Sequence, residues 1–343
     1  MVIDDLFWRF MKKLLVLIIS VFVFLNMFAC TNIKQDKTEI KVNEVTHSIF
    51  YAPFYVAIEG GFFEDEGLNI DLTNGGGSDA SMTALLSGSC DIALLGPETG
   101  IYTAIGSPKD LPVIFAQLTK RDGSFLMGRT KEENFSWGNL KGKEIIAGRR
   151  GGSPAMSLEY ALNKNGLFDG ENVTLNYDVQ FNLTAAAFIS GTGDYVTMFE
   201  PTASEYQREG KAYIVASVGQ ESGEVPFTCF MTKRSFYENN QEIVKKFTTA
   251  LFKAIKYIKE TDVNTVGNLL LKSFPSTSLQ SIVDSLNSYI KIDAWQTDLI
   301  MKKSSFDRLQ DIMENAGELD QRVEFSDLVD NKITEDCYKE VFN

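Results

Sequence analysis

The sequence predicts an α/β protein with two similar doubly wound lobes that are joined by two hinge crossings. Three observations carry this prediction: a repeated strand-helix-strand unit, a short apolar stretch after each copy, and an amphipathic helical tail. The chain has 343 residues, of which 44% are hydrophobic and 12% are aromatic. That length and composition allow two hydrophobic cores.

The repeat aligns residues 68–100 with residues 171–203 without gaps, at a constant offset of 103 positions. Each copy reads as strand, loop, helix, Ser-Gly turn and strand. In the first copy we expect strands over residues 70–72 and 92–95 and a helix over residues 80–86. The continuous apolar run over residues 92–95 suits a parallel strand that is buried on both faces.

Each copy is followed by a short extended apolar stretch that ends in basic residues, over residues 125–131 and 229–234. We interpret these stretches as the two hinge crossings. Apolar stripes at helical spacing within residues 243–258 and 279–289 predict helices in a tail that returns to the first lobe. The predicted boundaries are residues 39–128 plus 230–335 for lobe 1 and residues 129–229 for lobe 2.

The only long apolar run, residues 14–28, has the make-up of a secretory signal. Lys12 and Lys13 precede it and Ala29 and Cys30 follow it, which gives the basic, apolar and small-residue segments of such a signal. The alternative is an uncleaved anchor, but the run is shorter than the roughly 20 residues that a membrane-spanning helix needs. We therefore expect an exported protein.

Residues 27–30 resemble a bacterial lipobox, with a small residue before the cysteine. We expect a signal peptide over residues 1–29, whose true start is Met11 because acidic residues precede the basic pair. Cleavage would leave Cys30 acylated, with residues 30–38 as a lipid-anchored linker. The predicted location is the outer face of the cytoplasmic membrane, or the periplasm.

The charge and the rare side chains exclude several classes of function. A formal net charge of −13 argues against a nucleic-acid partner, because phosphate binding needs a basic surface. His47 is the only histidine, and the cysteines after Cys30 are scattered without metal or redox spacing. We therefore expect no metal, no cofactor and no disulfide framework.

Several motifs resemble the periplasmic-binding-protein type II fold, and more narrowly the family of alkanesulfonate-, nitrate- and thiamine-pyrimidine-binding proteins. The motifs are YAPFYVA at residues 51–57, GFFEDEGL at 61–68, LLSG at 85–88 with Asp91, and LKGK at 140–143. The resemblance covers roughly residues 40–320. It implies a cleft between two lobes that closes on a small solute, which is delivered to an ABC permease and its ATPase.

In doubly wound sheets the ligand lies at the carboxyl ends of the strands. After the first strand we expect His47, Phe50 and Tyr51 at the cleft, where the rings could sandwich a flat ligand; alternatively they pack the lobe surface. After the second strand, Gly76 and Gly77 let backbone N–H groups approach a ligand at a helix N-terminus.

Ser78 begins the helix after these glycines, either as a ligand contact or as the helix N-cap. After the third strands come Glu98 and Thr99 in lobe 1 and Glu200 at the equivalent place in lobe 2. The two carboxylates could accept hydrogen bonds from an amino group or a heterocyclic N–H. Equally, each could match the dipole of its own helix.

The first strand of lobe 2 is followed by Arg149, Gly152 and Ser153 at a helix start, which is the better anion candidate of the two lobes. Arg149 could hold a carboxylate or a sulfonate in bidentate fashion, or it is a surface or inter-lobe arginine. The second strand of lobe 2 is followed by Phe181 and Asn182, without glycines.

Carboxylates together with aromatic rings favour a nitrogen heterocycle, such as a pyrimidine of the thiamine pathway. An aliphatic sulfonate or another anion is the alternative that Arg149 keeps open. A further alternative is an enzyme, because a thiamine-pyrimidine synthase shares this fold and uses pyridoxal phosphate, but its cysteine-rich motif has no counterpart here. We expect a monomeric, non-enzymatic solute-binding lipoprotein of an ABC importer.

Overall fold

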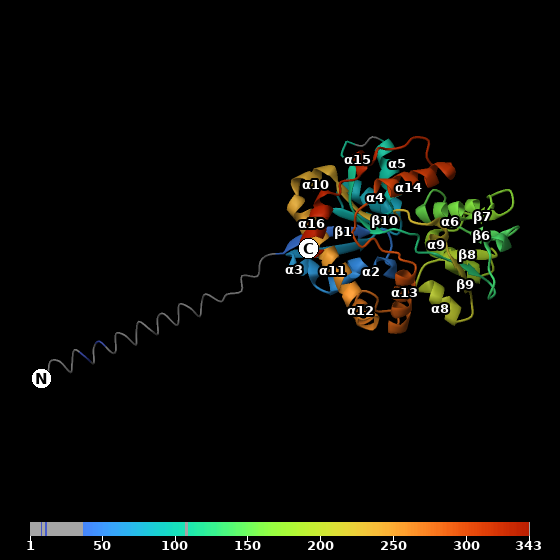
Figure 1. Cartoon of the computed structure of the whole chain (residues 1–343), viewed down its shortest axis with the longest axis horizontal. Coiled ribbons are helices and arrows are strands. Elements are labelled where there is room, and N and C mark those ends of the chain that lie inside the picture. The colour runs from blue at the N-terminus through green and yellow to red at the C-terminus, as the bar shows by residue number, and fades with distance from the viewer. Residues whose placement is uncertain (1–7, 9–10, 12–36, 107–108, 343) are drawn as a thin grey trace. The chain divides into compact units, whose positions relative to one another are not determined.

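The structure, a computed structural model, describes Trp8, Met11 and residues 37–106 and 109–342 (Figure 1). Cys30 and most of the predicted signal segment lie outside these residues, so their roles stay predictions. No described helix is both long enough and apolar enough to span a membrane. Thr38–Asn343 forms one compact unit.

Two five-stranded sheets form the centre of this unit. The first sheet contains β1 (Thr38–Glu44), β2 (Leu68–Asn74), β3 (Ile92–Leu95), β4 (Pro112–Thr119) and β10 (Thr228–Lys233). The second sheet contains β5 (Phe125–Gly128), β6 (Glu144–Ile146), β7 (Thr174–Asn176), β8 (Tyr195–Met198) and β9 (Tyr213–Ser217). The strand orders are β2-β1-β3-β10-β4 and β7-β6-β8-β5-β9.

The two sheets are built alike. β1 pairs in parallel with β2 and β3, and β6 pairs in parallel with β7 and β8. β3 and β8 end the two copies of the repeat, and both are buried at all four positions, as continuous apolar runs predict. The predicted α/β fold of two similar doubly wound lobes is confirmed.

Helices pack against both sheets (Figure 1). Those of lobe 1 are η1 (Ile49–Tyr51), α2 (Ala52–Glu59), α3 (Phe62–Asp65), α4 (Ser78–Ser87), α5 (Pro97–Ile105), α10 (Arg234–Asn239), α11 (Gln241–Glu260), α12 (Val263–Leu270), α13 (Leu279–Lys291), α14 (Lys303–Asn315), α15 (Phe325–Leu328) and α16 (Lys332–Phe342). Those of lobe 2 are η2 (Trp137–Leu140), α6 (Ser153–Lys164), η3 (Phe181–Leu183), α7 (Thr184–Ile189), α8 (Thr202–Arg208) and α9 (Val218–Ser222).

The chain crosses between the sheets twice. Residues 120–124 lead from β4 in the first sheet to β5 in the second, where β5 pairs antiparallel with β8 and β9. Residues 223–227 lead back to β10, which pairs antiparallel with β3 and β4. The first crossing therefore precedes β5, whereas the boundary predicted after residue 128 follows it. A short apolar strand does not reveal in its sequence which sheet it joins.

The tail completes the core of lobe 1. α11 places Phe247, Leu251 and Ile255 on one face, and all three are buried. The ring centroid of Phe247 lies 5.1 Å from that of Phe230 in β10 and 6.3 Å from that of Phe54 in α2. Each such side chain contributes roughly 1.5–3 kcal/mol to folding through burial. This packing holds the tail against the first sheet.

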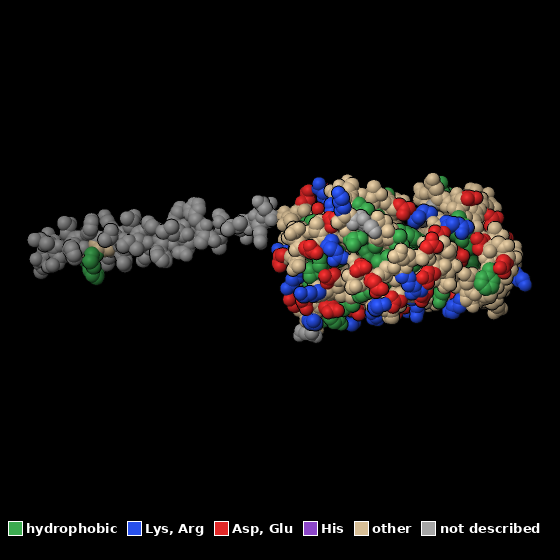
Figure 2. Space-filling view, turned by 90° about the horizontal axis from the view of Figure 1, so that it is seen from above, with side chains coloured by type: hydrophobic (Ala, Val, Ile, Leu, Met, Phe, Trp, Pro, Cys, Tyr) green, Lys and Arg blue, Asp and Glu red, His purple; other side chains and the backbone are tan. Residues whose placement is uncertain are grey.

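The molecular surface is charged but mixed in sign. Figure 2 shows one face, on which Lys and Arg side chains lie among Asp and Glu side chains. Exposed ion pairs of this kind each contribute about 0–1 kcal/mol, so the stability of the fold depends mainly on the buried apolar side chains.

Candidate functional site

The loops that follow the parallel strands of the two sheets meet where the lobes touch. β3 leads into α5 and β6 leads toward α6, and the first turns of these helices contact each other across the lobe boundary. β8 is followed by Phe199, whose ring centroid lies 5.7 Å from that of Phe50 in η1. This is the place where a doubly wound fold holds a ligand.

Glu98 is a carboxylate buried between the lobes, only 2% exposed. Its Oε2 accepts a 2.6 Å hydrogen bond from the hydroxyl of Ser153, at the start of α6. The carboxylate folds back over Gly96, where a Cβ atom would lie 2.1 Å from Oε2, so a larger residue does not fit there. Burial raises the pKa of Glu98, and the hydrogen bond from Ser153 opposes that effect. Two predicted site residues are thus in direct contact across the boundary.

Arg149 also spans the lobe boundary. Its guanidinium lies 3.2 Å from the carboxylate of Asp79 in α4, and the two side chains are 48% and 65% exposed. Beside it, the Tyr102 hydroxyl of α5 donates to the Gly151 carbonyl at 3.1 Å, and Gly152 is the N-cap residue of α6. An exposed pair contributes about 0–1 kcal/mol. This geometry corresponds to the inter-lobe alternative for Arg149.

Glu200, the equivalent carboxylate in lobe 2, accepts hydrogen bonds at the N-terminus of α8. Its Oε2 accepts from the backbone N–H of Ser204 at 2.9 Å, and its Oε1 accepts from the Ser204 hydroxyl at 2.8 Å. The backbone N–H of Glu200 donates to the hydroxyl of Tyr289 in α13 at 3.1 Å. Glu200 precedes the N-cap residue Pro201 and accepts from the first turn of α8, which corresponds to the helix-dipole alternative.

Phe50 is part of an aromatic core at the lobe boundary. It is buried, and its ring centroid lies 5.0 Å from that of Tyr289 and 5.8 Å from that of Phe227 in the second crossing. A Cβ atom on Gly123, in the first crossing, would lie 2.5 Å from the Phe50 ring. The backbone carbonyl of Phe50 accepts from the Trp295 indole at 2.9 Å. The ring is surrounded by protein, as the packing alternative predicts.

Tyr51 differs from Phe50 because it carries a hydroxyl group. The residue is buried, yet its hydroxyl makes no hydrogen bond within the described part of the chain. Burial raises the pKa of this hydroxyl well above its usual range, and the nearby negative charges of Glu44 and Glu98 raise it further. Tyr51 is therefore a buried side chain whose hydroxyl does not hold the lobes together through any hydrogen bond of the described residues.

His47 belongs to a polar cluster at the end of β1. Its Nδ1 lies 2.8 Å from Oε1 of the buried Glu44, and its Nε2 lies 2.8 Å from the carbonyl oxygen of Ser273. The Tyr55 hydroxyl donates to the other oxygen of Glu44. The hydrogen bond with Glu44 raises the pKa of His47, which partial burial opposes. His47 thus joins the end of β1 to the loop that precedes α13.

The remaining predicted residues of lobe 1 shape the strand-end loops. Gly77 is the N-cap residue of α4, and the Ser78 hydroxyl accepts from the N–H of Gly96 at 3.3 Å, so Ser78 links two loops instead of capping its helix. The Thr99 hydroxyl donates to the Gly96 carbonyl at 2.7 Å. Gly76 has a φ of +72°, a conformation that favours glycine.

The second loop of lobe 2 contributes less to the boundary. Asn182 lies in η3 and is exposed, and the side chain of Phe181 falls outside the described parts of the structure. Within the described residues, no group of three or more His, Cys, Asp or Glu side chains is placed to hold a metal ion.

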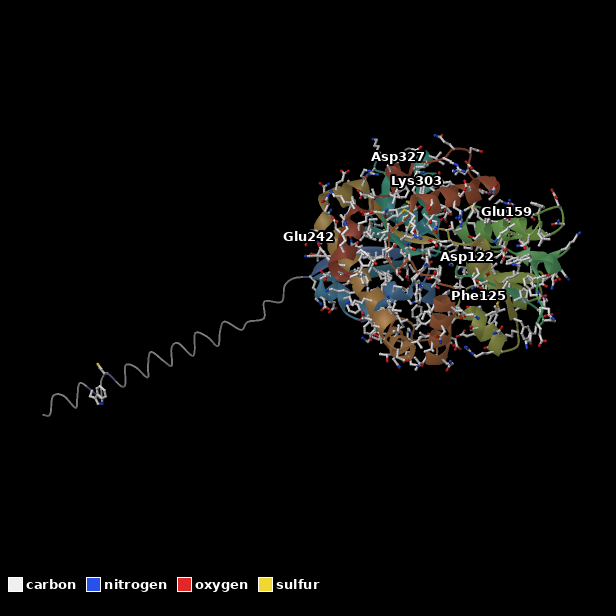
Figure 3. The ribbon with its side chains drawn as sticks, viewed as in Figure 1. Asp122, Phe125, Glu159, Glu242, Lys303 and Asp327 are labelled. Carbon is white, nitrogen blue, oxygen red and sulfur yellow. The ribbon has the colours of Figure 1, made fainter. Side chains whose placement is uncertain are left out.

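Asp122 is a buried carboxylate that the sequence analysis missed. It lies in the first crossing, where the lobes meet (Figure 3), and is fully buried. Its Oδ1 accepts from the N–H of Ser124 at 2.6 Å, but its Oδ2 and the Ser124 hydroxyl have no hydrogen-bond partner among the described residues. Burial raises the pKa of Asp122 to about 7. Its charge also raises the pKa of the Tyr289 hydroxyl, a lesser cause than burial and Glu200.

The lobe boundary is thus strongly acidic inside. Its four buried carboxylates, each at most 2% exposed, are Glu44, Glu98, Asp122 and Glu200. Two basic side chains near them are paired: Lys120 with Asp293 at 2.8 Å, and Arg149 with Asp79. Arg121 lies 3.9 Å from Asp293, and its buried Nε has no hydrogen-bond partner among the described residues. Glu44, Glu98 and Glu200 already accept hydrogen bonds from protein donors, whereas Asp122 keeps one oxygen without a partner in the described part of the chain.

Residues 49–263 match the sequence profile of NMT1/THI5-like proteins, over more than half of the chain. The chain belongs to the NMT1/THI5-like family. It is 42% identical over 311 residues to a Bacillus subtilis protein named "Putative binding protein YtlA", covering 90% of this chain and 93% of that protein. The predicted family resemblance is confirmed.

Solved structures agree with this assignment at the level of the fold. The alkanesulfonate-binding protein SsuA from Xanthomonas axonopodis, bound to MOPS, matches with a TM-score of 0.69 at 18% identity, covering 86% of this chain and 99% of that one. The periplasmic nitrate-binding protein NrtA from Synechocystis matches with a TM-score of 0.69 at 15% identity, covering 89% and 88%. The chain therefore shares the fold of these two binding proteins.

Proposed function

We propose that this protein is an exported solute-binding lipoprotein that captures a small nitrogen heterocycle, such as a pyrimidine, between its lobes and delivers it to an ABC permease. The observation that carries the proposal is Glu98, a buried carboxylate that meets Ser153 of the other lobe at 2.6 Å. The relative named as a binding protein, and the fold shared with an alkanesulfonate-binding protein, support a binding role.

The charge of the boundary favours a donor-rich ligand over an anion. A sulfonate or nitrate would lie among four buried carboxylates, whose ionised forms repel an anion in a medium of low dielectric constant. The arginine closest to the predicted anion site, Arg149, is half exposed and already paired with Asp79. Lys120 and Arg121 of the first crossing are better buried, at 15% and 22% exposure, but both lie within 4 Å of the carboxylate of Asp293.

Opening of the lobes would free the groups that a heterocycle needs. Separation of α5 from α6 removes the Ser153 hydroxyl from Glu98, and a ligand N–H can take its place as the donor. The Tyr51 hydroxyl has no competing hydrogen bond, and its ring offers a flat surface. A micromolar affinity corresponds to about −8 kcal/mol, and a buried charged hydrogen bond of this kind costs roughly 2–5 kcal/mol when truncated.

The ligand class can be tested with Glu98→Gln. We expect aminopyrimidines, but not alkanesulfonates or nitrate, to raise the thermal midpoint of the wild-type protein. Glu98→Gln should weaken pyrimidine binding at least about tenfold in calorimetry, because the amide is a weaker acceptor than the carboxylate. Glu242→Gln is the matched control, since Glu242 is exposed in the first turn of α11, far from the boundary (Figure 3). Stabilisation by sulfonates alone, or equal affinity in Glu98→Gln, would contradict the proposal.

The lipid anchor needs a separate test, because Cys30 lies outside the described residues. We expect Cys30→Ser to move the protein from the membrane fraction to the soluble exported fraction. Cys90→Ser is the control, because Cys90 is a buried thiol in lobe 1. Persistent membrane attachment of Cys30→Ser would rule out acylation at this residue.

A further inference from the structure

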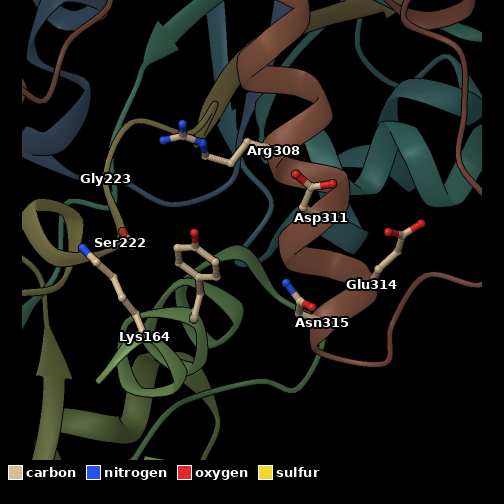
Figure 4. A pocket seen from close by; sticks show the side chains of 8 residues that line it. Lys164, Ser222, Gly223, Arg308, Asp311, Glu314 and Asn315 are labelled. Carbon is tan, nitrogen blue, oxygen red and sulfur yellow. The ribbon is translucent and has the colours of Figure 1, made fainter. Parts of the chain in front are cut away.

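A groove lies between the lobes, and none of the buried carboxylates lines it. This groove has a volume of about 630 Å³ and is bordered by α6 and the end of α9 on the side of lobe 2 and by α14 on the side of lobe 1 (Figure 4). Lys164 and Ser222 line the first wall, and Arg308, Asp311 and Asn315 line the second. Both lobes therefore contribute polar side chains to it.

Most charged side chains of the groove already have ionic partners. Arg322 pairs with both Asp311 and Glu314. Lys164 pairs with Glu221, with 3.2 Å between the ammonium nitrogen and a carboxylate oxygen. Lys164 is thus neutralised within the protein, and the two carboxylates of the other wall share one arginine.

Arg308 is the exception. It forms no ion pair within the described part of the chain, and its only hydrogen bond there runs from Nη1 to the carbonyl oxygen of Glu224 at 3.3 Å. Figure 4 shows its guanidinium extending from α14 across the groove toward Gly223. Most of its N–H donors are therefore free to bind an anion in the groove.

Ser222 supplies a second unused donor next to this guanidinium. The residue is 4% exposed, lines the groove, and its hydroxyl has no hydrogen-bond partner among the described residues. It precedes Gly223, where a Cβ atom would lie 3.5 Å from Nη1 of Arg308. Gly223 also has a φ of +85°, a conformation that glycine allows. A buried hydroxyl without a partner is unfavourable, and a bound acceptor would satisfy it.

We propose that this groove is a second ligand site, which binds a small organic carboxylate through Arg308 and Ser222. The planar guanidinium matches the two oxygens of a carboxylate, and the Ser222 hydroxyl can donate to one of them. A cation is disfavoured, because Asp311 and Glu314 are already held by Arg322. Because the two walls belong to different lobes, a carboxylate bound here contacts both lobes. The affinity of the groove for the carboxylate therefore depends on the angle between the lobes.

The test is a calorimetric titration of the full chain with succinate, a small dicarboxylate. We expect saturable binding to the wild type and about tenfold or weaker binding to Arg308→Gln, which loses the charged hydrogen bonds. Lys303→Gln is the matched control: it removes one positive charge from the same helix, but Lys303 is 62% exposed and pairs with Asp307 instead of lining the groove. The affinity of Lys303→Gln for succinate should equal that of the wild type.

Two further variants keep the test decisive. Ser222→Ala should weaken succinate binding several-fold through loss of one hydrogen bond. If Arg308→Gln lowers the thermal midpoint of the protein, the titration is repeated with Arg308→Lys. Lysine keeps the positive charge but lacks the planar guanidinium, so this variant should also bind succinate more weakly than the wild type. No saturable succinate binding to the wild type, or equal affinity in the arginine variants, overturns the site. The titration uses no cleft ligand, so its outcome is independent of the pyrimidine proposal.

Discussion

At the scale of single residues, His47 is an ionisable group whose pKa is raised by its contacts in the fold. The hydrogen bond with Glu44 raises the pKa of His47 in the folded protein above the value of about 6.5 expected for the unfolded chain. The charged histidine therefore stabilises the fold fully below about pH 6.5, and this contribution is lost as the pH rises through the raised pKa.

We predict that the wild type loses more stability between pH 6 and pH 8 than His47→Gln does. Glutamine keeps hydrogen-bonding capacity but carries no charge, and His47 is the only histidine of the chain, so the difference isolates one ionisation. Urea unfolding of both proteins between pH 6 and pH 8 measures this difference in the free energy of unfolding. Identical pH profiles would show that the pair between Glu44 and His47 makes no net contribution to stability.

The boundary residues illustrate which part of the site a sequence can predict. The repeat placed Glu98 and Glu200 at equivalent strand ends, and the structure has both carboxylates there, buried at the lobe boundary. The repeat could not reveal the partner of Glu98, because Ser153 is 55 residues away in the sequence and belongs to the other lobe. Asp122 was missed because an Arg-Asp-Gly-Ser segment reads as an exposed polar turn.

At the scale of elements, the first crossing depends on close packing between a glycine and an aromatic ring. Gly123 lies against Phe50, and a Cβ atom there would be 2.5 Å from the ring. Phe50 is held in turn by Tyr289 and Phe227, so it has no space into which to move. The path of the crossing is therefore fixed by a contact between lobe 1 and the hinge.

We predict that Gly123→Ala destabilises the protein by about 1–3 kcal/mol, which is the usual cost of overpacking a filled core. Gly138→Ala in η2 is the control, because the nearest heavy atom to its Cβ position is 3.7 Å away, an ordinary contact distance. Denaturant unfolding of the two variants gives the comparison. A loss in Gly123→Ala no greater than in the control would mean that the crossing can shift away from Phe50.

The elements themselves were predicted well where a pattern repeats and poorly where a strand changes sheets. The repeat identified β3 and β8 as buried strands, and both are buried throughout. β5 was assigned to the end of lobe 1, although its backbone pairs with β8 and β9 of lobe 2. Strand pairing between sheets is a long-range property, which a segment of four apolar residues does not encode locally.

At the scale of the whole molecule, the lobes are held together by contacts of unequal strength. The hydrogen bond from Ser153 to Glu98 is buried, whereas the pair between Arg149 and Asp79 is half exposed. Loss of a donor to a buried carboxylate costs more than loss of an exposed ion pair, because the carboxylate is left without solvation. The contact between Ser153 and Glu98 should therefore contribute most to the equilibrium between open and closed lobes.

We predict that Ser153→Ala shifts the ligand-free protein toward the open state. With the hydroxyl gone, Glu98 is better solvated when α5 and α6 separate, so opening becomes more favourable by roughly 1–3 kcal/mol. Small-angle scattering should then give a larger radius of gyration for Ser153→Ala than for the wild type. Arg149→Gln, which loses a pair worth about 0–1 kcal/mol, should change the radius much less. If both variants keep the wild-type radius, the closed state is held by the aromatic core around Phe50 rather than by Glu98.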